Sequence, residues 1–354
     1  MIFSSPNLAL KLTVPAAFFG YAVLANLALF SVPGVALPGY GGLLNGKVSQ
    51  AIDGLYRENL PHKAPSIGLI GAARYVLLGE GRSGVVVGDN GFLFTSEEFR
   101  SVDDAAYAAA LGRVDQAAEQ LSTEGVQLIL APIPAKLDLM RTDAQDPDAS
   151  DVLAKLYDKF LTDLTGRGIS VVDTRVGLDA LPTPFLTTDT HWTPEGARAV
   201  ANLVAVSGLV PLGTDEVTIE TGTETVFSGD LVTYVTSNSL APLLGLHRES
   251  VTPYVATVQT SEDGLVDLFG GDGGGVDLVG TSYSANPNWS FAEALKLELS
   301  RDVINHAEEG RGPFDPMVTY LDALDPLALP EAVIWEIPVR YLTDPKLVIA
   351  KGVE

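Results

Sequence analysis

The chain has 354 residues, of which 46% are hydrophobic and 8% aromatic, so it can bury a sizeable core and is not a disordered polymer. Its formal net charge of −23 excludes non-specific nucleic-acid binding, because no basic surplus exists to displace counterions, and an acidic polysaccharide would need a local groove of Arg and Lys. The absence of cysteine excludes disulfides, thiolate metal sites and a cysteine nucleophile.

Residues 1–46 are predicted to direct the chain to a membrane. Lys11 is their only charged side chain, and the apolar run 12–30 is about long enough to cross a bilayer as a helix before the helix-stop signal at Pro33. An uncleaved signal anchor fits the length of this run better than a cleaved signal peptide, for which Gly34-Val35-Ala36 is a weak cleavage site. A buried core helix is the remaining alternative. We expect the rest of the chain to be exported.

Residues 47–80 are predicted to form an amphipathic helical neck, and residues 81–350 a single α/β domain. The domain opens with the stretch 85–94, in which two short apolar runs flank Asn90-Gly91. This pattern predicts a β-hairpin. Residues 208–275 are rich in Thr, Val, Gly and Asp, and we expect them to form a partly β insertion.

Strands and helices are expected to alternate through the rest of the domain. The predicted strands are 126–132, 169–172, 276–280, 302–305 and 332–337. The predicted helices are one from a capping box at Ser101 and Asp104 to about Leu121, then 152–165, one capped by Thr193 with Pro194 at its first position, 291–299 and 317–324. Five short apolar strands between helices predict a mostly parallel sheet covered on both faces. Its ligand site is expected at the carboxyl ends of the strands, in the loops after Val172, Gly280 and Asn305.

Two short stretches contain residues suited to nucleophilic catalysis. Asp189 and His191 are two residues apart in a predicted loop, so the carboxylate can reach a ring nitrogen and hold the imidazole in one tautomer. Ser282 follows a predicted strand, and Gly280 is expected to permit unusual backbone angles that expose the hydroxyl. Taken singly, each stretch is more often an ordinary helix entry or loop serine. The four histidines are scattered without zinc-site spacing, so no metal site is predicted.

These stretches resemble the SGNH-hydrolase-like domain of the alginate O-acetyltransferase proteins of Gram-negative bacteria. The resemblance rests on four motifs: Val-Val-Gly-Asp-Asn-Gly-Phe-Leu-Phe at 86–94, Asp-Thr-His-Trp-Thr-Pro-Glu-Gly at 189–196, Gly-Thr-Ser-Tyr-Ser at 280–284 and Val-Ile-Trp-Glu-Ile-Pro at 333–338. Ordinary SGNH esterases place the serine before the Asp/His pair. The reverse order here is the circularly permuted arrangement of the alginate acetylation family.

The resemblance implies a triad in which Ser282 is the nucleophile, His191 the base and Asp189 the residue that orients it. Oxyanion donors are expected from Asn286, Asn288 and the Ser282 amide, and Arg311 is the expected substrate contact. The implied protein is a periplasmic O-acetyltransferase that needs no cofactor. A membrane-bound O-acyltransferase would supply its acetyl groups, and it would work beside other polysaccharide biosynthesis and secretion proteins.

The sequence leaves two alternatives open. A polysaccharide acetylesterase of the same fold would use the same acyl-enzyme with water as the acceptor. A non-catalytic scaffold of a secretion complex is the other alternative, although it would not need an intact triad. The acceptor is expected to be an exopolysaccharide, either alginate, acetylated cellulose or another polymer.

Overall fold

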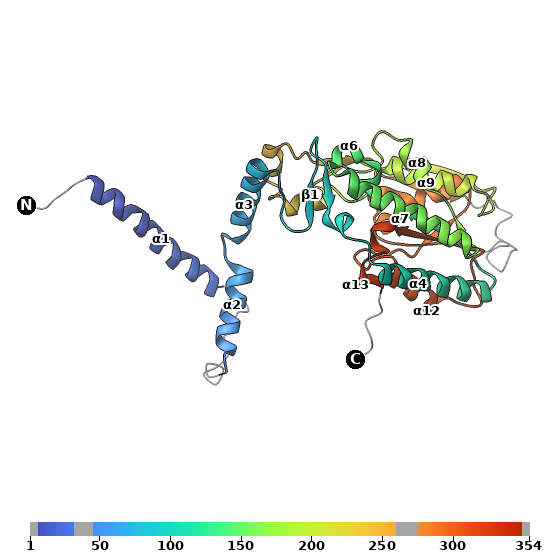
Figure 1. Cartoon of the computed structure of the whole chain (residues 1–354), viewed down its shortest axis with the longest axis horizontal. Coiled ribbons are helices and arrows are strands. Elements are labelled where there is room, and N and C mark those ends of the chain that lie inside the picture. Colours follow the sequence, from blue (N-terminus) through green and yellow to red (C-terminus); the bar gives the residue numbers. More distant parts are fainter. Residues whose placement is uncertain (1–5, 32–44, 260–274, 349–354) are drawn as a thin grey trace, which may run out of the picture.

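The structure, a computed structural model, describes residues 6–31, 45–259 and 275–348. Three parts follow one another along the chain: an N-terminal helix, a helical neck and an α/β domain (Figure 1). The neck consists of α2 (Lys47–Asn59) and α3 (Lys63–Leu78), as expected.

Helix α1 (Pro6–Phe30) projects away from the domain (Figure 1). The expectation of a single helix over residues 12–30 is therefore confirmed. Its segment Leu12–Phe30 is apolar and long enough to cross a membrane, and most of its side chains are exposed. Both Pro33 and the possible cleavage site at residues 34–36 lie outside the described residues.

The domain is built on a five-stranded parallel sheet, which confirms the predicted architecture. Its strand order is β10 (Val303–Asn305), β9 (Val276–Val279), β11 (Ala332–Pro338), β3 (Gln127–Ile133) and β4 (Ser170–Val171). Every neighbouring pair is parallel, and Trp335 of central β11 lies opposite both Leu130 and Val279. All five strands therefore end at one edge of the sheet, where a ligand site is expected.

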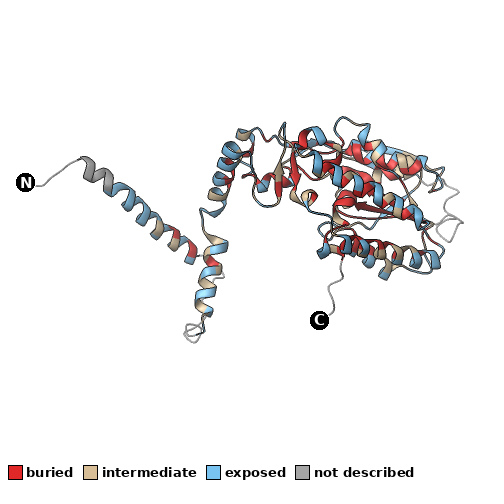
Figure 2. Cartoon of the chain, viewed as in Figure 1, coloured by how far each residue is buried: buried red, intermediate tan, exposed pale blue. Residues whose placement is uncertain are grey.

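Helices cover both faces of the sheet and seal two apolar cores (Figure 2). Helices α4 (Asp104–Thr123), α7 (Pro147–Gly166) and α12 (Phe314–Ala323) pack on one face. Helices α8 (Arg175–Asp179), α9 (Pro194–Val206) and α11 (Phe291–Leu299) pack on the other. In β11, Val333 and Trp335 point to the first core and Ile334 to the second, because side chains alternate along a strand.

Two helix starts differ from the sequence expectation. Helix α4 is capped by Asp103, whose carboxylate accepts a hydrogen bond from the Ala106 amide, so the predicted capping box at Ser101 was wrong. The first amides of a helix have no acceptor within the helix, and the Asp103 carboxylate accepts from one of them, so Ser101 is not needed as a cap. Helix α7 starts at Pro147, before the predicted Val152, because Asp146 caps it there. The prediction that Thr193 caps α9 is confirmed.

The hairpin and the middle part of the insertion lie together beside the sheet's carboxyl edge, whereas the strand pair at the two ends of the insertion packs on α11. Strands β1 (Val85–Val87) and β2 (Leu93–Thr95) pair antiparallel, as predicted. The described part of the insertion contains β5 (Glu216–Thr221), β6 (Thr225–Phe227), η3 (Asp230–Tyr234), η4 (Ala241–Leu244), β7 (Glu249–Val251) and β8 (Tyr254–Gln259). Leu93 of the hairpin shares a third small core with Leu231 and Val235, which joins the insertion to the hairpin.

Candidate active site

The structure brings Ser282, His191 and Asp189 into a hydrogen-bonded row. The Ser282 Oγ lies 2.7 Å from His191 Nε2, and His191 Nδ1 lies 2.6 Å from Asp189 Oδ1. An ionised carboxylate can only accept, so Nδ1 donates to Asp189 and Nε2 is free to accept from the serine hydroxyl. Ser282 is the first residue of the short helix α10 (Ser282–Ala285), directly beyond β9. Asp189 and His191 lie in the long connection between β4 and α9.

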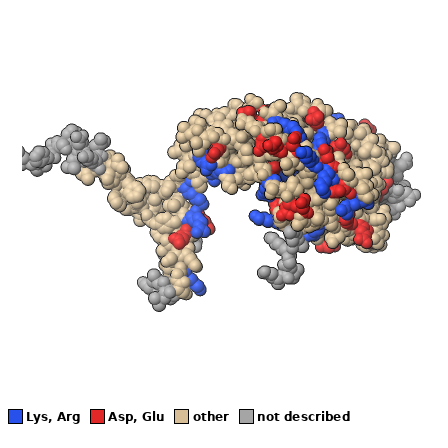
Figure 3. Space-filling model, viewed as in Figure 1, with Lys and Arg blue, Asp and Glu red and all other residues tan. Residues whose placement is uncertain are grey.

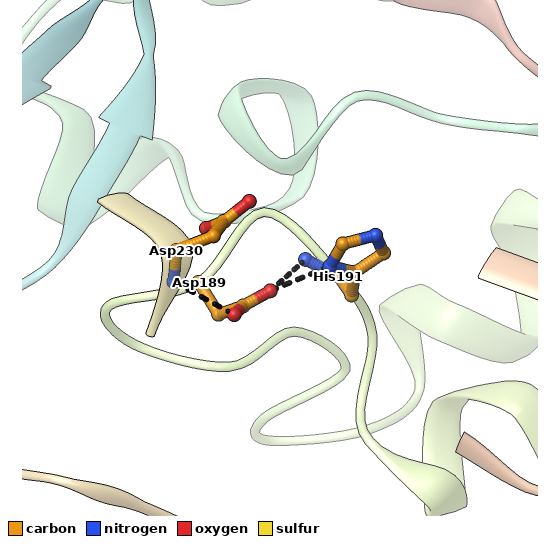
Figure 4. A group of neighbouring side chains, drawn as sticks. All are labelled: Asp189, His191 and Asp230. Atoms are coloured by element: carbon orange, nitrogen blue, oxygen red, sulfur yellow. Dashed lines mark hydrogen bonds and ion pairs between the residues drawn. The ribbon is translucent and has the colours of Figure 1, made fainter. Parts of the chain in front are cut away.

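Asp189 is oriented by more than its histidine. Its Oδ1 also accepts from the His191 amide at 3.0 Å, and its Oδ2 accepts from the Asp230 amide at 2.9 Å (Figure 4). Burial by itself would raise the pKa of Asp189, but the hydrogen bond and charge of His191, with the two amides, hold it below its usual range. The carboxylate therefore stays charged while it fixes the imidazole.

Asp230 lies in η3 of the insertion, next to the row. Its carboxylate accepts from the Thr190 amide at 2.9 Å and from the Thr190 hydroxyl at 2.7 Å. Burial and the neighbouring charge of Asp189 raise the pKa of Asp230. The insertion thus holds the Asp189–His191 loop from the side through both the backbone and the side chain of one residue.

The turn that carries Ser282 rests on Glu336, a fully buried carboxyl near the end of β11. Glu336 Oε2 accepts from the Thr281 amide at 2.7 Å, and from the hydroxyls of Thr281 and Ser284 at 3.0 Å each. Burial raises the pKa of Glu336 to about 7. A Cβ on Gly280 would lie 2.5 Å from Glu336 Oε2. The expected reason for Gly280 was wrong: its φ is not positive, and the glycine is needed for close approach.

Lys136 connects the loop that contains Asp189 and His191 to the hairpin β1–β2 by hydrogen bonds. It follows β3, is buried, and its Nζ donates to the carbonyls of Leu93, Thr187 and Asp189 at 2.7, 2.9 and 2.9 Å. Burial lowers the pKa of Lys136 to about 8, against the opposing pull of Glu98 and more distant carboxylates. Its three donors are thereby matched by three acceptors, so the ammonium is fully satisfied.

Aromatic side chains enclose the imidazole. The His191 ring stacks on Trp289 with centroids 5.2 Å apart, and it lies 4.9 Å from the Tyr283 ring. Trp289 Nε1 donates to the Ser282 carbonyl at 3.2 Å. The ring is thus held between apolar faces and cannot rotate away from the serine without breaking that packing.

A cavity of about 420 Å³ opens onto Ser282 and His191. Its other wall is made by Glu97, Arg100 and Arg340, whereas Asp230 closes the side next to the histidine. Two arginines and two carboxylates leave this cavity near neutral in a strongly acidic molecule. Arg340 is buried and donates to the Tyr283 hydroxyl at 2.6 Å, and its Nε has no hydrogen-bond partner among the described residues.

Three other predicted site residues lie elsewhere. Asn286 caps the short helix η6 (Pro287–Trp289) by accepting from the Asn288 amide, and both line a different cavity of about 400 Å³. Arg311 is exposed and pairs with Glu308 at 2.7 Å. None of the three lines the Ser282 cavity. The loop after Asn305 was also expected at the ligand site, but none of its residues lines the Ser282 cavity; His306 and Glu308 line a separate cavity of about 370 Å³.

Sequence reasoning missed Asp230, Lys136, Glu336, Arg100 and Arg340. Two of these had a signal. Glu336 is the single charged residue within an apolar strand. Lys136 follows shortly after another apolar strand, at the carboxyl edge of the sheet where ligand sites are expected. No pattern distinguishes Asp230 from the other acids of the insertion, because only the fold brings it to Asp189.

Ligand atoms of Asp189, His191 and Asp230 lie within 4.8 Å of one another, close enough to hold a metal ion. All four carboxylate oxygens already accept hydrogen bonds, from His191, the Asp230 amide and Thr190. The donor set therefore fits an imidazole-orienting network better than a cation site.

Comparison with known proteins agrees with this geometry. Residues 85–339 match the family described as "SGNH hydrolase-like domain, acetyltransferase AlgX". The chain belongs to this family. It is 38% identical over 316 residues to the "Probable alginate O-acetylase AlgJ" of Pseudomonas syringae pv. tomato, covering 85% of this chain and 80% of that protein. The AlgJ of Pseudomonas aeruginosa is 36% identical over 355 residues, covering 92% of this chain and 88% of the other.

A solved structure of the family superposes on the domain. The O-acetyltransferase domain of Pseudomonas putida AlgJ has a TM-score of 0.63 and 31% sequence identity, and the match covers 75% of this chain and 97% of that domain. The predicted SGNH-hydrolase-like fold is thereby confirmed. As an SGNH hydrolase-like acetyltransferase, the chain carries the serine on α10 and the Asp/His pair in the β4–α9 connection.

Proposed function

We propose that this chain is a periplasmic O-acetyltransferase that passes acetyl groups through Ser282 to hydroxyls of alginate. The observation that carries the proposal is the continuous row from Ser282 through His191 to Asp189, in a chain whose relatives are named alginate O-acetylases. A serine hydroxyl becomes a useful nucleophile only when an oriented base removes its proton.

The geometry supports a two-step transfer. In the first step His191 Nε2 takes the Ser282 proton, Oγ attacks the acetyl carbonyl of the donor, and the donor oxygen leaves with that proton. In the second step the same nitrogen takes the proton of a sugar hydroxyl, whose oxygen attacks the acetyl ester. Ser282 then leaves and recovers the proton. Asp189 stays ionised in both steps and stabilises the imidazolium.

The tetrahedral intermediate needs donors for its oxyanion. The amide of Ser282 opens α10, so it has no partner within the helix and is the first candidate. Asn286 and Asn288 belong to the neighbouring cavity and are not part of this proposal.

An anionic acceptor would meet Arg100 at the cavity wall opposite the histidine. Arg100 is partly exposed and pairs with Glu97 at 3.5 Å and with Asp344, whereas Arg340 is buried and its Nε lies 3.6 Å from Glu97 Oε2. A uronate carboxylate would therefore bind Arg100 by taking the place of Glu97, since a guanidinium can bind a carboxylate in bidentate fashion. Arg311 pairs with Glu308 outside this wall and has no part in the proposal.

The acetyl donor is proposed to be a membrane-bound O-acyltransferase, with other proteins of the polysaccharide pathway as neighbours. The apolar α1 would tether the domain to the inner membrane, with the cavity on the periplasmic side. A tether keeps the enzyme near a donor that cannot leave the bilayer.

Mass spectrometry of the purified chain after exposure to p-nitrophenyl acetate tests the function. We expect one acetyl group on Ser282 and none in Ser282→Ala. Adding alginate oligosaccharides should then remove the acetyl group and acetylate the sugar. Release as free acetate in the presence of the acceptor would indicate an esterase, and no acetyl on Ser282 would contradict the mechanism.

A further inference from the structure

Helix α3 has one face fixed to the domain. Gly68, Gly71 and Ala72 are buried against the segment after η3, where a Cβ on Gly71 would lie 2.0 Å from the Val235 carbonyl oxygen. The Thr236 hydroxyl donates to the Gly68 carbonyl at 2.8 Å. Backbone lies directly on backbone here, so α3 and the insertion form one rigid contact.

The opposite face of α3 is apolar and uncovered. Large apolar side chains of α3 are between 62% and 78% exposed at Leu69, Ile70, Val76 and Leu77. Counted from Leu69, the other three follow at one, seven and eight residues, a spacing that places all four on one side of the helix. We call these four residues the α3 apolar face. Across the described ranges outside α1, every other helix or strand exposes at most one large apolar side chain. Such a cluster marks a surface that another body covers.

The α3 apolar face is turned away from the domain, because it lies opposite the buried Gly68 and Gly71 on the helix. Figure 1 shows α3 between α1 and the domain, and Figure 3 shows α1 and α3 mostly tan while charged atoms crowd the domain. The neck also contacts α1 directly. The Tyr21 hydroxyl lies 2.6 Å from Nδ1 of His62, the residue before α3, and Tyr56 of α2 donates to the Asn26 side chain.

We propose that the α3 apolar face lies on the lipid bilayer and is a second membrane contact beside α1. The proposal rests on the proposed function in one respect, that α1 crosses the membrane. Tyr21 and Asn26 both lie within the apolar segment Leu12–Phe30, so their contacts hold the neck beside the helix that would cross the membrane. An amphipathic helix held beside a spanning helix is suited to lie along the membrane with its apolar face in the acyl region.

Charge supports lipid as the occupant. Lys63 and Arg74 are exposed and flank the α3 apolar face on one side, although Arg74 also pairs with Glu80 at 2.8 Å. Residues 45–84 contain five basic and three acidic side chains, in a chain whose net charge is −23. A locally basic segment is attracted to anionic lipid headgroups, whereas the acidic domain is repelled from them.

The contact would hold the active site at a fixed height over the membrane. Val235 and Thr236, on which α3 packs, directly follow η3, and η3 supplies Asp230, Leu231 and Tyr234 to the Ser282 cavity. A helix lying on the bilayer is therefore one short turn from the cavity wall. This arrangement would present Ser282 to an acetyl donor that arrives through the membrane.

Spin labelling of the full chain tests the proposal, and the absence of cysteine makes each label unique. Nitroxides would be attached at Leu69→Cys, Leu77→Cys, Val206→Cys and Leu24→Cys, and the protein reconstituted in phosphatidylethanolamine–phosphatidylglycerol vesicles. Val206 is the matched control, because it is 69% exposed on α9 of the domain. Leu24 reports on α1 itself. The measured quantity is label accessibility to lipid-soluble oxygen relative to a water-soluble nickel chelate.

We expect the ratio of oxygen to nickel accessibility at Leu69 and Leu77 to exceed that at Val206 at least several-fold, and to approach that at Leu24. Equal ratios at Leu77 and Val206 would overturn the membrane contact. Spin–spin broadening at Leu77 without lipid accessibility would overturn it in favour of a second copy of the chain. Aqueous accessibility at Leu24 would show instead that the proposed tether is wrong. Acetylation of Ser282 in the same samples checks the enzyme separately.

Discussion

The Lys136 ammonium lies 2.9 Å from the carbonyl oxygen of Asp189, so a buried cation holds the backbone of the residue whose carboxylate bonds the His191 ring. The same ammonium holds Thr187 and the hairpin carbonyl of Leu93. Lys136 touches no atom of the triad side chains. It is a positioning residue, and its effect should appear in stability and turnover together.

Lys136→Met should cost about 3–5 kcal/mol of unfolding free energy, because three carbonyls lose their donor and the nearby Glu98 loses its counter-charge. We expect kcat to fall more than KM rises. Urea denaturation and acetyl-transfer kinetics measure the two effects. Lys159→Met is the control: Lys159 is exposed, pairs with Asp163 and lies over the Tyr107 ring, so its loss should cost about 1 kcal/mol. Equal costs for both variants would contradict this role.

Ser282→Ala should abolish acetylation, by about 10⁴-fold or more, because no other oxygen lies on His191 Nε2. Its unfolding free energy should change by less than about 1 kcal/mol, since the side chain is small and half-buried. Acetyl content per sugar, measured by NMR on polymer from cells carrying each variant, is the readout.

Matched variants separate the roles around the nucleophile. His191→Ala should lose as much activity as Ser282→Ala, and Asp189→Asn somewhat less, because the imidazole can still act when poorly oriented. Ser284→Ala leaves Ser282 in place to carry the acetyl group and removes only a hydrogen bond to Glu336, so the variant should keep partial activity. Normal acetylation in Ser282→Ala would refute the mechanism, and loss of polymer together with acetyl would point to a scaffold.

Glu336 should make the protein less stable as the pH rises from about 4.5 to 7. Its folded pKa is raised to about 7 from an ordinary value of 4.5, so in this window the unfolded chain ionises while the folded protein keeps its proton. The stabilisation is complete below pH 4.5 and is lost as the pH passes the folded pKa, with a total near 3 kcal/mol, or about 1.4 kcal/mol per pKa unit.

Glu336→Gln should flatten this part of the pH dependence. Unfolding free energies of wild type and variant, measured by denaturant titration at pH 5 and pH 7.5, give the double difference. The exposed Glu309→Gln serves as the control for surface charge. A wild-type-like slope in Glu336→Gln would show that another group titrates in this window.

Gly280→Ala should destabilise the protein by about 1–3 kcal/mol and lower kcat, because the new methyl would meet Glu336 Oε2 at 2.5 Å and Ser284 Oγ at 2.9 Å. Glu336 cannot yield easily, since it is buried and already accepts three hydrogen bonds. Gly112→Ala, in α4 with nothing within 4 Å of the new Cβ, should instead stabilise by about 0.5–1 kcal/mol. Equal effects would show that space at Gly280 is not limiting.

Local patterns in the sequence were sufficient for the parallel sheet, the hairpin and the choice of the three residues that the structure brings into one hydrogen-bonded row. Short apolar runs such as 332–337 must lie inside a sheet covered on both sides, and Asp189 and His191 are close enough in the chain to meet without help from the fold. The approach of Ser282 to this pair also followed from sequence, through the family's motif order. The starts of two helices were predicted wrongly. Aspartate caps a helix as effectively as serine, and here Asp103 and Asp146 are the residues that cap α4 and α7.

Tertiary structure alone decided which charges surround the triad and which face of the neck stays bare. Asp230 and Lys136 act on Asp189 across 41 and 53 residues of chain, and Glu336 supports Thr281 across 55. A buried charge is tolerated only where particular donors or acceptors converge on it, and that convergence comes from strand order and loop packing. The α3 apolar face is likewise defined by contact: the sequence predicts an amphipathic neck, and only the packing of α3 on Val235 and Thr236 shows which side stays exposed.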